Sequence, residues 1–407
     1  MDSEALRGVR VADFSWAIAA PIATWIMALM GAEVIKIESA RRPDHLRTVM
    51  DTFGVHYPSL EACPIFNQLN LNKLNVSIDL RKPEGLELVK RIIGISDVVV
   101  ENFSAGVMDR LGLGYEALRE VKPDIVMVSQ SASGSSGPWK GIVANAAVFG
   151  SLGGLTFLSG YPDLGPTEVG PMNDPRTATV VLFAVMAALC HHKKTGEGQY
   201  VDLSSVEAQT CFVGDIIMDY VINQRIPERM GNHDAVMAPH NCYPCLGDDQ
   251  WVTIAVASEE EWQALCNVIG ESIWTRSEKF GDAYRRKQNE TELDNLITEW
   301  TSQHNRDELV EAMQKAGVAA FRSSRAEDIF HDKHLWERDY FTQVEHPAIG
   351  RQTVISSPWK FSQTPVVVKR AAALVGQDNE YVLGQLLGKS KDEMVRLKEQ
   401  EVIFDKF

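Results

Sequence analysis

The chain has few basic residues for its acidic content. Its 407 residues contain 40 Lys and Arg against 55 Asp and Glu, which gives a formal net charge of −15. Proteins that bind nucleic acids hold phosphates with Lys and Arg gathered on a basic face. The composition therefore argues against a nucleic-acid partner, whereas an anionic small ligand needs only a local basic patch.

A long apolar run and an export signal are also missing. The two longest apolar stretches, 17–30 and 177–190, fall short of the ~20 residues that span a membrane. The N-terminal MDSEALRGVR carries acids and lacks the basic-then-apolar order of a signal peptide. We therefore expect a cytoplasmic protein with no membrane partner, in which the six cysteines stay reduced.

The motifs of common cofactor and metal sites are absent as well. The first predicted strand is followed by SWAIAAP and not by GxGxxG, and no Walker lysine loop occurs, so the usual dinucleotide and P-loop sites are unsupported. Cys242 and Cys245 form one CxxC without a second pair, and His331 and His334 have no third ligand nearby. We expect no metal site and no permanently bound cofactor.

The chain does contain a regular alternation of strands and helices. Strands are predicted at 9–14, 34–38, 75–80, 97–101 and 124–129, and helices at 21–30, 83–95 and 115–120. Apolar strands that alternate with amphipathic helices predict a parallel sheet covered on both faces. The predicted fold class is therefore α/β.

The character of the sequence changes after residue 225. A strand-like segment at 251–256 is followed by polar helical segments, and loop-rich sequence then precedes a last helical stretch at 379–399. We predict a large α/β domain at 1–225, a smaller α+β domain at 226–323 and a return segment at 324–407.

Asp174 is the residue whose role decides most of the functional interpretation. It precedes Pro175 and a long apolar run in NDPRTATVVLFAVMAALC, and Asp before Pro is a helix-start signal. Asp174 is therefore a candidate helix N-cap. A carboxylate with a reference pKa of ~3.9 is also ionised at neutral pH and can act as a nucleophile without a general base. The two roles are compatible.

Four phrases, taken in order, carry a family resemblance. They are VADFSWAIAAPIATWIMALMGAEVIKIE (11–38), LNLNKLNVSIDLRKPEG (69–85), ENFSAGVMDRLGLGYEALREVKPDIVMVS (101–129) and KKTGEGQYVDLS (193–204). Together they resemble CoA-transferase family III, the group that includes formyl-CoA:oxalate CoA-transferase and, as a branch, α-methylacyl-CoA racemase. The likeness implies a Rossmann-like large domain built from both chain ends, a late-inserted small domain, and two chains interlocked like rings, as a homodimer or a heteromer with a related subunit.

The resemblance implies a covalent reaction at Asp174, which matches the family's catalytic aspartate. The carboxylate attacks a donor acyl-CoA to give an aspartyl anhydride, CoA thiolate converts this into an aspartyl-CoA thioester, and an acceptor acid then takes up the CoA. CoA thioesters are thus substrates. We expect succinyl-CoA as the donor and a bulky or aromatic acid, such as benzylsuccinate, as the acceptor, because small residues at 144, 146 and 147 leave room.

The resemblance also assigns contacts to CoA and to the substrate acid. Positions that match the family's CoA contacts are Ala17, Ile18, Lys73, Asn102, Phe103 and Arg110. Cations suit the phosphates, and an aromatic ring can stack on adenine. Ser39 stands where relatives often have an Arg, so we expect Arg41 or Arg42 to replace it. Trp16 and Asn145 are expected in the substrate pocket.

Asn145 separates the two branches of the family. Racemase relatives have a His there and use it with the aspartate to remove and return an α-proton, whereas an amide has no useful basicity. We therefore favour CoA transfer over racemisation. A CoA-binding subunit without turnover of its own is the third interpretation, and the presence of Asp174 argues against it.

Overall fold

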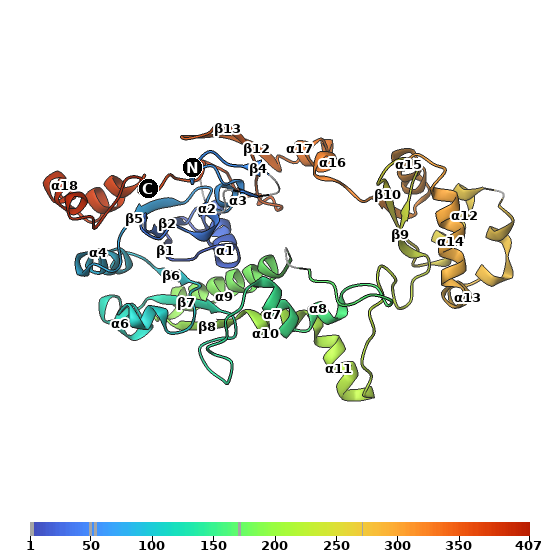
Figure 1. The fold of residues 1–407 in the computed structure, drawn as a ribbon, viewed down its shortest axis with the longest axis horizontal. Helices are drawn as coiled ribbons and strands as arrows, with labels where there is room; N and C mark the ends of the chain where they lie inside the picture. The colour runs from blue at the N-terminus through green and yellow to red at the C-terminus, as the bar shows by residue number, and fades with distance from the viewer. Residues whose placement is uncertain (1–3, 49–50, 53–54, 170–171, 271) are drawn as a thin grey trace. The chain divides into compact units, whose positions relative to one another are not determined.

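The computed structural model describes residues 4–48, 51–52, 55–169, 172–270 and 272–407 (Figure 1). The chain divides into two compact units. The large unit comprises Met1–Thr156, Glu168–Gln224 and His334–Phe407, and the small unit comprises Phe157–Thr167 and Arg225–Lys333. The large unit is thus built from both ends of the chain.

A six-stranded sheet, parallel throughout, organises the large unit. In sheet order its strands are β5 (Leu74–Ser77), β2 (Glu33–Glu38), β1 (Arg10–Asp13), β6 (Val98–Glu101), β7 (Val126–Ser131) and β8 (Tyr200–Ser204). This is the doubly wound order, which reverses between β1 and β6, and ligands of such sheets bind at the carboxyl ends of the strands beside the reversal. The predicted α/β class and parallel sheet are confirmed.

Helices cover both faces of the sheet because its strands are apolar on both sides (Figure 1). On one face, α1 (Ala19–Leu29) and α9 (Asn173–Thr195) share a core with Val126 and Val128 of β7. The helices that share the core of the other face are α4 (Pro83–Gly94), α5 (Val107–Arg110), α6 (Tyr115–Val121), the π-helix η5 (Glu380–Leu386) and α18 (Lys391–Glu399). The last two show that the C-terminal segment completes this core.

The predicted final helix at 379–399 is in fact two helices, η5 and α18. Gly388 has a φ of 71°, a left-handed conformation that ends a helix, and Ser390 then starts α18 through a capping box with Glu393. The left-handed conformation of Gly388 and the cap at Ser390 thus interrupt the single helix that the sequence pattern predicts.

Shorter elements complete the large unit or lie at its boundaries. The helices are α2 (His45–Thr48), α3 (Pro64–Leu69), α7 (Ala146–Leu152), α8 (Leu155–Leu158), α10 (Ser205–Thr210), the 3₁₀ turn η2 (Cys211–Val213), α11 (Gly214–Asn223) and α17 (Lys333–Glu337). The antiparallel pairs are β3 (Asp51–Thr52) with β4 (Val55–His56), and β12 (Phe341–His346) with β13 (Gly350–Ile355). No helix in the described part of the chain is long and apolar enough to cross a membrane.

The small unit contains an antiparallel sheet. In sheet order its strands are β11 (Ala319–Arg322), β10 (Trp251–Ala255) and β9 (His240–Pro244). The helical elements are α12 (Glu259–Ile269), η3 (Ile273–Arg276), η4 (Glu278–Phe280), α13 (Ala283–Gln288), α14 (Glu290–Thr301), α15 (Arg306–Ala316) and α16 (Ala326–Phe330). Trp262 and Phe280 lie in the core of this unit. A capping box between Ser258 and Glu261 starts α12.

Candidate active site

Two cavities in the large unit lie at the carboxyl ends of the central strands. The first has a volume of about 690 Å³, and its polar and aromatic lining residues include Trp16, Arg41, Arg42, Arg81, Asn102 and Phe103. The second has a volume of about 270 Å³, and its lining residues include Ile18, Gln130, Ser131, Lys140, Asn145 and Asp174. Ala17, Asn102, Phe103 and Ser104 line both, so the two cavities share a wall.

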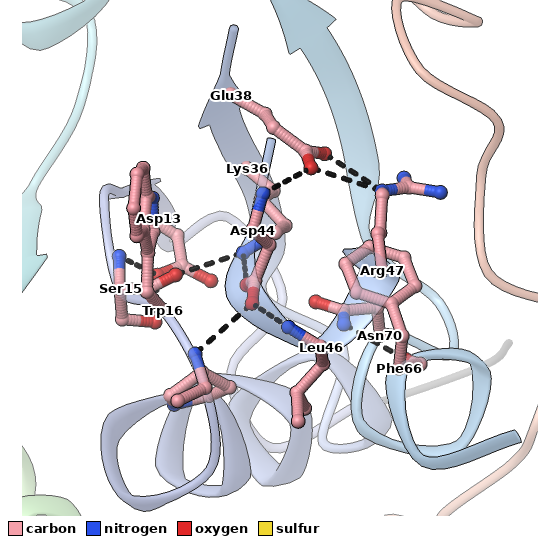
Figure 2. Close-up of polar contacts among 12 residues, drawn as sticks. Asp13, Ser15, Trp16, Lys36, Glu38, Asp44, Leu46, Arg47, Phe66 and Asn70 are labelled. Atoms are coloured by element: carbon pink, nitrogen blue, oxygen red, sulfur yellow. Dashed lines mark hydrogen bonds and ion pairs between the residues drawn. The ribbon is translucent and has the colours of Figure 1, made fainter. Parts of the chain in front are cut away.

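The loop that follows β1 forms part of this wall, and buried charged side chains hold it (Figure 2). Asp13 accepts a hydrogen bond from the backbone N–H of Ser15 at 2.9 Å, and Asp44 accepts one from Ala17 at 3.1 Å. Lys36 donates to the Ser15 carbonyl at 2.8 Å and pairs with Asp44 at 2.9 Å. Ala17 has a φ of 59°, which a residue with a Cβ adopts only where its surroundings impose it. The network therefore fixes the shape of the wall.

Lys73 belongs to the same buried network and lines neither cavity. Its ammonium group pairs with Asp13 at 3.1 Å and donates to the hydroxyl of Thr24 at 2.8 Å. Burial lowers the pKa of Lys73 to about 8, although the carboxylate of Asp13 opposes this shift. The structure therefore does not bring Lys73 to the predicted CoA contact, and its charge instead neutralises Asp13.

Asn102 and Phe103 lie with Trp16 on the wall of the first cavity. The Asn102 side chain accepts from the backbone N–H of Trp16 at 2.7 Å and donates to its carbonyl at 2.8 Å. The Trp16 and Phe103 rings meet edge to face, with centroids 5.7 Å apart. Asn102 thus positions Trp16, and the two rings offer an apolar surface for a flat heterocycle.

The three predicted phosphate-binding arginines differ in their surroundings. Arg41 pairs with Glu401 at 2.5 Å and lies over the ring of Phe404. The guanidinium of Arg42 lies 5.1 Å from the ring centroid of Trp16, and no carboxylate among the described residues pairs with it. Arg110 is exposed on α5 and lines neither cavity. Arg42 is therefore the cation most available to an anion in the first cavity.

Asp174 lies in the first turn of α9 and not at its N-cap. The helix begins at Asn173, and the N-cap position is Met172, which makes no side-chain capping bond. The predicted N-cap role is therefore wrong. The reason is tertiary: Gln209 donates to the carbonyl of Asn173 at 2.9 Å, and the Asn173 amide donates to the carbonyl of Ala146 at 3.0 Å. These bonds hold Asn173 at the start of the helix.

Two glycines allow this close packing around Asn173 and Gln209. A Cβ on Gly150 would lie 2.2 Å from the Asn173 amide nitrogen, and one on Gly153 would lie 2.5 Å from the Cβ of Gln209. Sequence analysis missed all four residues as supports of Asp174. The small residues of FGSLGG were the available signal, but they did not indicate which segment packs against them.

Asp174 is half-buried, and it is the one carboxylate among the described residues that line the second cavity. The same lining contains no His, and Lys140 is its one cation. Burial raises the pKa of Asp174 to about 6. Asn145 lines this cavity too, and its side chain caps α7 by accepting from the N–H of Val148 at 3.4 Å. The described lining thus offers a carboxylate without a histidine to act with it as an acid–base pair.

The raised pKa of Asp174 predicts a pH dependence of activity. Only the ionised carboxylate is a nucleophile, so kcat/KM for an acyl-CoA donor should fall about tenfold per pH unit below about 6 and level off above it. Initial rates from about pH 5 to 8 measure this, and the thermal unfolding midpoint over the same range controls for loss of structure. A profile that stays flat down to about pH 5 would contradict the assignment.

Comparisons with known proteins agree on one family. A family model described as CoA-transferase family III matches residues 6–379. Succinyl-CoA–D-citramalate CoA-transferase of Chloroflexus aurantiacus is 31% identical over 401 residues, which cover 98% of each chain. The β subunit of succinyl-CoA–L-malate CoA-transferase from the same organism is 27% identical and covers 98% of each chain. A crystal structure of a CaiB/BaiF family protein from Brucella suis superposes with a TM-score of 0.85 at 26% identity, covering 94% of this chain and 99% of that one.

Proposed function

Because the chain belongs to CoA-transferase family III, we propose that it transfers CoA from succinyl-CoA to a compact dicarboxylic acid through covalent intermediates on Asp174. The observation that carries the proposal is the position of Asp174. It is the one carboxylate in the described wall of a small cavity that adjoins a larger cavity with aromatic and guanidinium side chains.

The proposed reaction begins when a carboxylate oxygen of Asp174 attacks the thioester carbonyl of succinyl-CoA. The carbon–sulfur bond breaks, which leaves an aspartyl–succinyl anhydride and CoA thiolate. The thiolate attacks the aspartyl carbonyl and expels succinate, which gives an aspartyl-CoA thioester. The acceptor carboxylate then displaces the thiolate, and the thiolate attacks the acceptor's carbonyl, which releases the new acyl-CoA and restores Asp174.

The first cavity is proposed to hold the nucleotide part of CoA, with Arg42 as the principal phosphate ligand. The volume of this cavity and the Trp16 and Phe103 rings support this placement, and so does Arg42, which has no carboxylate partner among the described residues. Arg41 contributes less because Glu401 already holds it. The wall residues Ala17 and Ile18 are proposed to face the pantetheine arm where it passes into the second cavity.

Arginine variants test this placement. A charge-assisted hydrogen bond contributes about 1.5–3 kcal/mol, so Arg42→Ala should raise KM for succinyl-CoA by about tenfold or more. Arg41→Ala is the matched control and should raise it by less than about threefold, because its guanidinium is paired with Glu401. Initial rates against succinyl-CoA concentration measure both effects. A larger effect for Arg41→Ala than for Arg42→Ala would reverse the assignment.

The second cavity supports a compact dicarboxylic acceptor. Lys140 is exposed, lines this cavity and has no carboxylate partner among the described residues, so it is available for a second carboxylate. The volume of about 270 Å³ is sufficient for a compact dicarboxylic acid. The substrates named for two relatives, D-citramalate and L-malate, are dicarboxylic acids, which supports the same choice.

The proposed activity is tested by incubating the protein with succinyl-CoA and a panel of free acids in deuterium oxide. We expect new CoA esters of dicarboxylic acids, detected by mass spectrometry, without deuterium at their α-carbons. Deuterium at the α-carbon without acyl exchange would instead support racemisation, for which family members use a His that the described lining of the cavity lacks.

The proposal includes an assembly of two family III chains, interlocked as rings, in which the partner is a second copy or a related subunit. The support is an unusual helix surface: α11 has no buried residue and exposes Ile217, Met218, Val221 and Ile222. Exposed apolar side chains gathered on one element are typical of protein–protein contacts. One relative is named as the β subunit of a two-subunit enzyme, which supports the heteromeric form equally.

A further inference from the structure

The loop at 132–143, which follows β7 and carries Lys140, is tied to β8 near its start. Five of its residues line the second cavity: Ala132, Ser133, Lys140, Ile142 and Val143. Ser135 donates its backbone N–H to the two carboxylate oxygens of Asp202 in β8, at 2.9 and 3.0 Å, and its hydroxyl to one of them at 2.6 Å. Hydrogen bonds to an ionised carboxylate are roughly twice as strong as those between neutral groups. Asp202 is therefore an anchor for the loop.

The register of the sheet fixes where this anchor lies. Asp202 pairs with Ser129 of β7, which pairs in turn with Glu101 of β6, so the three side chains share one face of the sheet. Gly134 is buried and has a φ of 80°, a conformation that favours glycine, and both oxygens of Asp202 would lie 3.6 Å from a Cβ at this position. The chain thus turns at Gly134 against the side chain that holds the next residue.

Hydrogen bonds within the loop fix the backbone on both sides of Lys140. The Ser133 hydroxyl donates to the carbonyl of Trp139 at 2.6 Å, and the N–H of Ile142 donates to the same carbonyl at 2.9 Å. A carbonyl oxygen has two lone pairs and can accept both bonds. The loop is therefore closed on itself, and the bonds to Asp202 hold this closed loop beside the sheet.

One cation serves both acyl groups of the proposed reaction. The succinyl group of the donor and the acceptor acid occupy the second cavity in turn, and each carries a distal carboxylate. Lys140 is the one cation in the described lining of this cavity. An ammonium group binds a carboxylate only when it is held within hydrogen-bond reach, so the position of the loop decides how well either carboxylate is bound.

We infer that Asp202 is a positioning residue: through Ser135 it holds the loop from which Lys140 binds the distal carboxylate of both the donor and the acceptor. This inference rests on the proposed function. Asp202 lines neither cavity, so it acts through the loop and not by touching the substrate. It contributes to the selectivity for dicarboxylic over monocarboxylic acyl groups and not to the chemistry at Asp174.

Two donors test the inference. Butyryl-CoA has an acyl chain of the same length as succinyl-CoA and lacks the distal carboxylate. The formation of Asp174-linked CoA in single turnovers gives kcat/KM for each donor, and the wild-type protein should favour succinyl-CoA by about tenfold or more. Lys140→Met keeps the side-chain length, removes the charge and should bring this ratio near one.

Asp202→Ala should lower the succinyl-to-butyryl ratio by about threefold or more, because it removes all the bonds from Ser135. Its kcat/KM for butyryl-CoA should change by less than about threefold, which general damage to the fold would not allow. Ser135→Ala removes only the hydroxyl bond and should lower the ratio by a smaller factor. Glu345→Ala is the matched control: Glu345 is an exposed carboxylate on β12, pairs with Arg351 at 3.1 Å and lines neither cavity. It should keep the wild-type ratio.

The double variant Lys140→Met/Asp202→Ala shows whether Asp202 acts through Lys140. If it does, kcat/KM for succinyl-CoA in the double variant equals that of Lys140→Met alone, because the second change has no ammonium group left to misplace. A further fall of about threefold or more would show that Asp202 acts independently of Lys140 and would overturn the inference.

The remaining outcomes separate the inference from the proposed function. If the wild-type protein forms Asp174-linked CoA but Asp202→Ala and Ser135→Ala keep its donor ratio, the inference is wrong and the transferase proposal stands. The same holds if the wild-type protein uses both donors equally, because no distal carboxylate is then recognised. If it forms no Asp174-linked CoA from either donor, the proposed function fails and the inference fails with it.

Discussion

Replacing Asp174 by asparagine is expected to lower kcat for CoA transfer by about 10⁴-fold or more. The amide has nearly the same shape as the carboxylate, so the start of α9 and its bonds from Gln209 and Asn173 should be retained. It cannot form an acyl anhydride or an aspartyl-CoA thioester, however, and every proposed step passes through one of these. The loss should therefore appear in kcat and not in binding of succinyl-CoA.

The measurement combines initial rates with trapping of the enzyme-bound ester. Hydroxylamine added during turnover should modify Asp174 in the wild-type protein, and mass spectrometry should find no such modification in the variant. Asp392→Asn is the matched control, because Asp392 is also the second residue of a helix, α18, but is exposed to solvent. It should keep wild-type rates. Retention of more than about a tenth of the activity in Asp174→Asn would show that another group is the nucleophile.

Asp44→Asn is expected to lower the free energy of unfolding by about 3–5 kcal/mol. The side chains of Asp44 and Lys36 are 0% and 1% exposed, and their charged atoms are 2.9 Å apart (Figure 2). Asparagine removes the charge and places an N–H group opposite the Lys36 ammonium group. Breaking one side of a buried pair leaves a poorly compensated charge, and Asp13 and Glu38 then offset only part of the desolvation cost of Lys36.

The expected stability loss is measured by urea unfolding of the wild-type protein and the variant. Glu87→Gln is the matched control: it breaks an exposed ion pair with Lys90, in which the side chains are 70% and 34% exposed, and should cost less than about 1 kcal/mol. Asp44 also holds the N–H of Ala17 in the wall between the cavities, so KM for succinyl-CoA should rise in the folded variant. A loss below about 1 kcal/mol would show that solvent or rearrangement compensates Lys36.

The main features of the fold could be predicted because they depend on local pattern. The run Val98–Val100 in β6 is apolar on both sides, as a central parallel strand requires, and Pro83 begins α4 where its missing N–H is not needed. The predicted helix at 379–399 failed because its interruption depends on the left-handed conformation of Gly388 and on the cap at Ser390. Hydrophobic periodicity alone does not report such caps.

The candidate site could be predicted only in part. Trp16 lies in a phrase that resembles one family, and Asp174 was matched to the catalytic aspartate of that family. Arg42 was expected, with Arg41 as the alternative, to replace the Arg that relatives often have at the position of Ser39. Lys73 was predicted as a CoA contact because a lysine suits a phosphate, but a lysine suits the buried carboxylate of Asp13 equally well. Residue type does not distinguish these partners, since both are anions.

The sequence by itself determined the strands, the helices that cover them, the absence of dinucleotide and metal motifs, and Asp174 as the candidate nucleophile. These follow from patterns within a short stretch of chain. Only the tertiary structure decided that Glu401 holds Arg41, that no carboxylate in the described part of the chain pairs with Arg42, and that Gln209 and Gly150 support the start of α9. The physical reason is that hydrogen bonds, ion pairs and close contacts between residues far apart in the chain depend on distances that a single sequence does not contain.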